Sequence, residues 1–147
     1  MSTPSKWDDL KVRVLSGIAV LAIGVLAIWI GDWAIRCLSV VVAGLMLWEL
    51  SRLTAPAQPQ TATAIGALAA GSMALIFWFH GAYWLVLLLL PSILGLITPR
   101  RDRLIYAIYA FAIMLACYAF VAFREGYGLA FTLWLVLVVI ASDVMGY

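Results

Sequence analysis

Two carboxylates at the edges of apolar segments are the residues best placed to do chemistry. Asp143 follows a long apolar run with no cation three or four positions away, and Glu49 ends another run within reach of Arg52. A carboxylate at the centre of a membrane span costs about 2.5 kcal/mol or more and usually faces the protein interior. Oxygen ligands suit a hard cation such as Mg²⁺. Asp143 and Glu49 are therefore candidate metal ligands, with an ordinary interfacial charge as the alternative for each.

The other polar residues do not complete a site of a known kind. Asp32 lies four residues before Arg36, which predicts a snorkelling ion pair, and Asp102 and Glu125 are typical loop charges. His80 is the only histidine, and the chain has no phosphate-binding glycine-rich loop. Phosphoryl or nucleotidyl transfer needs several metal ligands and cations around the phosphates. Two acids and scattered arginines do not complete such a phosphoryl-transfer site.

The composition decides which elements must position these residues. The chain has 147 residues, of which 67% are hydrophobic and 11% charged, and its mean hydropathy is +1.12. A soluble domain carries about 25% charged residues, so this is an integral membrane protein. Continuous apolar runs exclude the alternating strands of a barrel and predict an all-α polytopic bundle. The basic residues are spread between the apolar runs rather than gathered into one stripe, so we expect no nucleic-acid partner.

The apolar runs predict about six spans in a single transmembrane domain covering 1–147. The predicted spans are 14–30, 33–50, 62–79, 82–97, 104–123 and 127–147, joined by short connections that include 124–126. Seven of the nine Lys and Arg residues lie on the side of the N-terminus. By the positive-inside rule the N-terminus is cytoplasmic, and six spans return Asp143 to the cytoplasmic side.

Two features of the predicted spans concern packing. Ala62, Gly66, Ala70 and Ala74 form a ladder of small residues that allows another helix to approach the third span closely. Pro91 lies inside the fourth span and is expected to kink it. Neither feature implies an activity.

Three segments together resemble the N-terminal half of the bacterial phosphatidate cytidylyltransferase (CDP-diacylglycerol synthase) family. The first is "LKVRVLSGIAV" at 10–20, the second "LWELSRL" at 47–53, and the third "ASDVMGY" at 141–147. The third is similar to the family's A-x-D-x-x-x-Y stretch. The three segments occur in the family's order and spacing.

The resemblance implies a reaction and a membrane location for it. The phosphate of phosphatidic acid would attack the α-phosphate of CTP, with Mg²⁺ as cofactor, on the cytoplasmic side of a bacterial inner membrane. It places Asp143 at the metal and nucleotide site and assigns Arg13 and Ser16 to the substrate-binding N-terminal segment. The family resemblance is also compatible with a homodimer.

The family's later Ser-Lys-Arg, Lys-Asp, His-Gly-Gly and Asp-Arg run is not in this sequence. We therefore expect the chain to be the N-terminal part of a longer enzyme and to be inactive alone. Three alternatives stay open: a small transporter using Pro91 and the intramembrane acids, a non-catalytic membrane scaffold, and another CTP-using lipid enzyme such as a polyprenol kinase relative.

Overall fold

The described part of the chain contains helices and short connecting loops, with no strand. The computed structural model describes residues 6–79 and 81–146, with side chains from residue 14 onward. The α-helices are α1 (Lys6–Ile30), α2 (Asp32–Thr54), α3 (Pro59–Trp78), α4 (Leu90–Ile97) and α5 (Arg103–Met145), and a 3₁₀ helix, η1 (Ala82–Leu89), precedes α4. The predicted all-α fold is confirmed.

Three of the described helices, α2, α3 and α5, are long and apolar enough to cross a membrane. The apolar part of α1 (Val14–Ile30) and the η1–α4 unit (Ala82–Ile97) are shorter. At 1.5 Å per residue the 43 residues of α5 measure about 65 Å along the helix path, roughly twice the hydrocarbon core. The six separate spans and their orientation stay a prediction.

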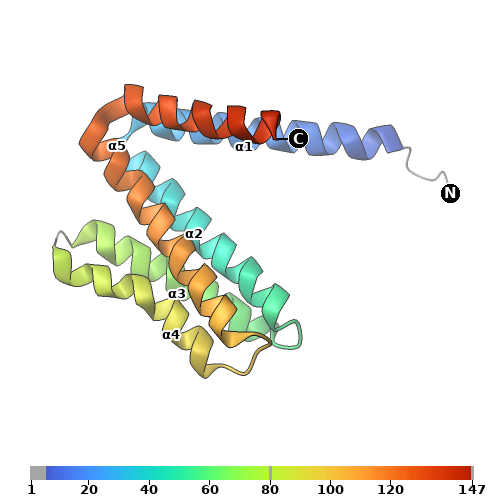
Figure 1. The fold of residues 1–147 in the computed structure, drawn as a ribbon, viewed down its shortest axis with the longest axis vertical. Helices are drawn as coiled ribbons and strands as arrows, with labels where there is room; N and C mark the ends of the chain where they lie inside the picture. The colour runs from blue at the N-terminus through green and yellow to red at the C-terminus, as the bar shows by residue number, and fades with distance from the viewer. Residues whose placement is uncertain (1–5, 80, 147) are drawn as a thin grey trace.

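The predicted break between the fifth and sixth spans is displaced. Residues 124–126 were expected to form a connection, but α5 continues through them and leaves helical geometry only at Gly128 (φ 81°, ψ −176°). A positive φ of this kind is readily adopted only by glycine. Figure 1 shows that α5 turns sharply near this point, so its last part runs back toward α1.

The helices form a bundle and an arm (Figure 1). The bundle contains α2, α3, η1–α4 and the first part of α5, and α2 contacts both α3 and α5. The arm contains α1 and the last part of α5. It joins the bundle through a small apolar cluster of Ile28, Ile35 and Val121, against which Leu129 and Leu133 pack.

The tightest contact in the bundle is the crossing of α2 and α3. A Cβ added to Gly66 would lie 2.7 Å from the Cβ of Trp48 and 2.9 Å from the carbonyl oxygen of Gly44. Ala62 and Gly66 are buried and Ala70 is half-buried, as the small-residue ladder predicted, whereas Ala74 is exposed. Helices approach this closely only where side chains are small.

Pro91 does not lie in the middle of one continuous α-helix. The preceding residues 82–89 form the 3₁₀ helix, and Pro91 falls in the first turn of α4. A proline is tolerated there because the N–H it lacks would have no partner within the helix. The proline thus marks the change from 3₁₀ to α geometry rather than a position inside one long α-helix, and the predicted kink stays a prediction.

Candidate functional site

The charged residues of the bundle gather at its two opposite ends. One end is formed by the last turns of α2 and α4 and by the loops that follow them, and we call it the arginine end. Its centre is Tyr106, whose side chain is completely buried. The Tyr106 hydroxyl lies 3.0 Å from the Ser51 hydroxyl. Gly95 lies directly against the Tyr106 ring, where a Cβ would overlap the ring atoms.

Arg100 covers the outer face of the Tyr106 ring. Its guanidinium carbon lies 3.7 Å from the ring centroid, a cation–π geometry. Nε and Nη2 donate to the Thr98 hydroxyl oxygen at 3.1 and 2.7 Å. Nη1 donates to the Thr54 hydroxyl oxygen at 3.4 Å. Three elements, α2, α4 and α5, therefore fix one arginine, and nothing in the sequence beyond the basic run 100–103 indicates this cluster.

The predicted metal ligands do not meet in the described structure. Glu49 is exposed near the end of α2, and Asp143 is exposed near the end of α5. No ion pair joins Glu49 to Arg52, and the Arg52 guanidinium lies instead 4.9 Å from the centre of the Trp48 ring. The described residues contain no group of three or more His, Cys, Asp or Glu side chains that could hold a metal ion. They do not fit a Mg²⁺ centre by themselves.

The two predicted substrate-binding residues lie on α1. Ser16 occupies an exposed stretch of that helix. The side chain of Arg13 lies outside the described residues. The roles of both stay predictions.

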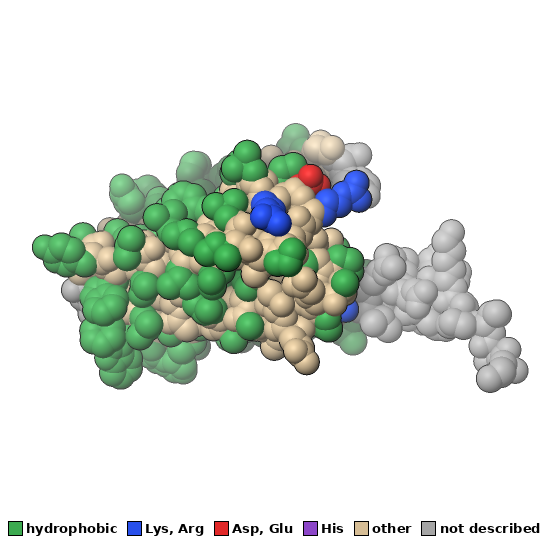
Figure 2. Space-filling model, turned by 90° about the horizontal axis from the view of Figure 1, so that it is seen from below, with side chains coloured by type: hydrophobic (Ala, Val, Ile, Leu, Met, Phe, Trp, Pro, Cys, Tyr) green, Lys and Arg blue, Asp and Glu red, His purple; other side chains and the backbone are tan. Residues whose placement is uncertain are grey.

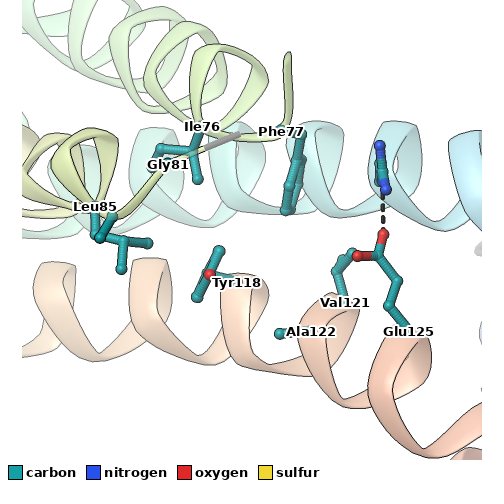
Figure 3. A pocket seen from close by; sticks show the side chains of 10 residues that line it. Ile76, Phe77, Gly81, Leu85, Tyr118, Val121, Ala122 and Glu125 are labelled. Atoms are coloured by element: carbon teal, nitrogen blue, oxygen red, sulfur yellow. Dashed lines mark hydrogen bonds and ion pairs between the residues drawn. The ribbon is translucent and has the colours of Figure 1, made fainter. Parts of the chain in front are cut away.

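The opposite end of the bundle contains a cavity of about 350 Å³ (Figure 3). Its walls are mainly apolar and come from α3, η1 and α5, with Phe77, Leu85 and Tyr118 facing the space. An ion pair between Arg36 Nε and Glu125 Oε1, 2.7 Å long, closes one side. The expected Asp32–Arg36 pair is therefore wrong, because Arg36 bonds instead to Glu125 of α5, which lies 89 residues later in the sequence.

A second arginine ties the arm to this end. Arg124 Nε donates to the carbonyl oxygen of Ile28 at 3.1 Å, in the last turn of α1. The carbonyls at a helix C-terminus carry partial negative charge and lack intrahelical partners, so a cation is favoured there. Arg36 and Glu125 are paired to each other and Arg124 bonds to α1, so these charges have structural partners. Among the described residues that line the cavity, no nucleophile is hydrogen-bonded to a base.

The fold and its apolar surface define a helical membrane protein. Comparison with known families is more specific: residues 11–147 match the cytidylyltransferase family. The chain belongs to that family, which confirms the resemblance carried by its three segments. Among the curated proteins and the solved structures, none matches this chain. The family supports a CTP-dependent transferase function.

Proposed function

We propose that this chain forms the N-terminal membrane part of a phosphatidate cytidylyltransferase in a bacterial inner membrane. In this reaction a phosphate oxygen of phosphatidate attacks the α-phosphorus of CTP, and pyrophosphate leaves as CDP-diacylglycerol forms. The observation that carries the proposal is the family match over residues 11–147. The three long apolar helices support it, because the lipid substrate is itself confined to a membrane.

The chain's own carboxylates would contribute only part of the site. The side chains of Asp143 and Glu49 are exposed and have no hydrogen bond or ion pair to a described residue, so both carboxylates are free to accept a metal ion or to orient a ligand. Magnesium, when bound, would neutralise the phosphates of CTP and of the leaving pyrophosphate. Because the described residues provide no cluster of three ligands, we propose that the chain alone makes no CDP-diacylglycerol.

A chimaera tests the proposal directly. Residues 11–147 replace the matching segment of an active full-length phosphatidate cytidylyltransferase, and membranes containing the chimaera are given CTP and phosphatidate. We expect CDP-diacylglycerol to form, measured as radiolabelled lipid product. Asp143→Asn should abolish the product, because the amide is neutral and binds a cation poorly. The chain alone should give no product.

The matched control is Asp32→Asn, which changes an acid of the same kind near the start of α2 and should leave turnover unchanged. Membrane insertion of each variant is checked by extraction and immunoblotting. A chimaera that inserts normally but uses only a polyprenol substrate would contradict the phosphatidate assignment. Full activity of the Asp143→Asn chimaera would remove that residue from the site.

A further inference from the structure

Arg100 is held in one orientation by partners that carry no net charge. The Thr98 hydroxyl donates to the Leu94 carbonyl at 3.0 Å, and the Thr54 hydroxyl donates to the Leu50 carbonyl at 2.9 Å. Each hydroxyl proton is thereby directed into its own helix, which leaves the oxygen lone pairs for the guanidinium. With the Tyr106 ring below it, Arg100 is fixed before any ligand arrives.

The guanidinium retains binding capacity. An arginine has five N–H donors in a planar fork, and the bonds to Thr98 and Thr54 use three of them. Among the described side chains no carboxylate lies within ion-pair distance of Arg100. The C-terminal turns of α2 and α4 offer it partial negative charge only. A half-buried cation with two spare donors and no counter-charge is complementary to a phosphate, which accepts two parallel N–H bonds.

The surroundings strengthen the positive potential. Arg52, Arg101 and Arg103 are exposed at the same end, whereas the acids there are Glu49 and Asp102. Asp102 lies 3.7 Å from Arg101 and so partly neutralises that residue rather than Arg100. Figure 2 shows arginine side chains near an acidic one on a surface with many hydrophobic side chains. Positive charge beside lipid-facing surface attracts anionic lipid headgroups.

We propose that Arg100 is the anchor of a binding site for the phosphate group of an anionic phospholipid. The two unused donors of the guanidinium bind two phosphate oxygens, and the exposed arginines add a longer-range attraction. A phosphomonoester such as phosphatidate exposes more charge and more oxygens than a phosphodiester, so it binds more tightly than phosphatidylglycerol, and phosphatidylcholine binds least. Phosphatidate is also the lipid substrate of the proposed function, so its place as the favoured ligand rests on that function, but binding at Arg100 needs neither CTP nor turnover and can be measured separately.

Lipid binding to the full chain tests this site. The chain is purified in detergent and titrated with phosphatidate, phosphatidylglycerol or phosphatidylcholine, and bound lipid is counted by native mass spectrometry. Arg100→Gln should weaken phosphatidate binding about tenfold, the loss of one charge-assisted interaction. Arg101→Gln removes the same charge from the same loop, but that side chain is 91% exposed, so its effect should be less than about twofold.

Three results would overturn the proposal. Equal losses in Arg100→Gln and Arg101→Gln would show diffuse attraction to the loop. Unchanged lipid binding in Arg100→Gln would leave Arg100 a purely structural residue. Displacement of phosphatidate by millimolar inorganic phosphate would show a site for free phosphate rather than for a lipid headgroup.

A second variant covers the case in which Arg100→Gln does not fold. Arg100→Lys keeps the charge but loses the planar fork, so phosphatidate binding should fall several-fold while thermal unfolding in detergent stays close to that of the parent chain. Unchanged binding by a folded Arg100→Lys chain would contradict a two-donor site. The same substitution can also be placed in the chimaera. If it abolishes lipid binding while the chimaera stays active, or abolishes activity while lipid still binds, then this site and the proposed reaction are distinct.

Discussion

Tyr106 joins three helices at a single buried residue. Its ring fills the space left by Gly95 of α4, its hydroxyl forms a hydrogen bond with the hydroxyl of Ser51 of α2, and the guanidinium of Arg100 stacks on its ring face. A buried tyrosine normally needs a partner for its hydroxyl, and Ser51, itself 1% exposed, provides one. This one side chain therefore organises the arginine end.

Removing the Tyr106 hydroxyl should show how much it contributes to the stability of the folded chain. Tyr106→Phe keeps the ring but leaves the Ser51 hydroxyl without this partner, and we expect a loss of about 1–2 kcal/mol in stability. The measurement is thermal unfolding in detergent. Tyr109→Phe, at a position 57% exposed, is the matched control and should change little. Equal effects of the two substitutions would show that the hydroxyl pair is energetically unimportant.

At the scale of elements, the α2–α3 crossing depends on the absence of side chains. Gly44 and Gly66 face each other across it, and Ala70 also contacts Gly44. Lipid offers the same apolar environment as a neighbouring helix, so close packing supplies much of the association. The crossing is accordingly sensitive to a single methyl group.

Gly66→Ala should separate the two helices. The new Cβ would lie within 3 Å of both the Trp48 side chain and the Gly44 carbonyl, so the helices must shift, at a cost of about 1–3 kcal/mol. Gly71→Ala on the same helix is the control, because nothing lies within 4 Å of the added methyl group. Thermal unfolding in detergent compares the two. A neutral Gly66→Ala would contradict the packing seen at this crossing.

The bend in α5 is a second element-scale feature. Gly128 adopts φ 81°, and the Thr132 hydroxyl donates to the Gly128 carbonyl at 2.9 Å in the turn that follows. The polar residues Arg124 and Glu125 indicated a break nearby. Their side chains instead bond to α1 and α2, and the helix continues through them and through Gly126, so the bend falls two residues later, at Gly128, where a glycine adopts a positive φ.

At the scale of the whole molecule, apolar side chains cover much of the surface. Leu15, Ile18 and Leu21 of α1 are each more than half exposed, as are Trp134 and Leu137 in the last part of α5. In water such a surface would aggregate, whereas in a bilayer it is solvated by lipid. We therefore expect the arginine end to lie at one membrane interface and the Arg36–Glu125 end at the other.

Sidedness can be measured by cysteine labelling. In a chain carrying Cys37→Ser and Cys117→Ser, a cysteine at Arg101 should react with a membrane-impermeant maleimide only after the cells are opened. A cysteine at Gly81 should react in intact cells, because the positive-inside rule places that turn outside. The reverse pattern would show the opposite orientation, and labelling of both in intact cells would contradict opposite faces.

The sequence by itself determined the class of the protein, because hydropathy and charge are sums over residues and need no geometry. It also indicated the family, through three short segments in the right order, and the close packing of the third predicted span, through small residues spaced four apart. These signals are local, and each depends only on residue types within one helix or on their order along the chain.

Only the tertiary structure decided which charged residues meet. Arg36 pairs with Glu125 rather than Asp32, and Arg100 stacks on Tyr106 beneath two threonines from other helices. Asp143 and Glu49 stay exposed at the ends of separate helices. Such partnerships depend on helix rotation and crossing, which arise from packing of the whole bundle. A long arginine side chain can reach several partners, and the fold selects one of them.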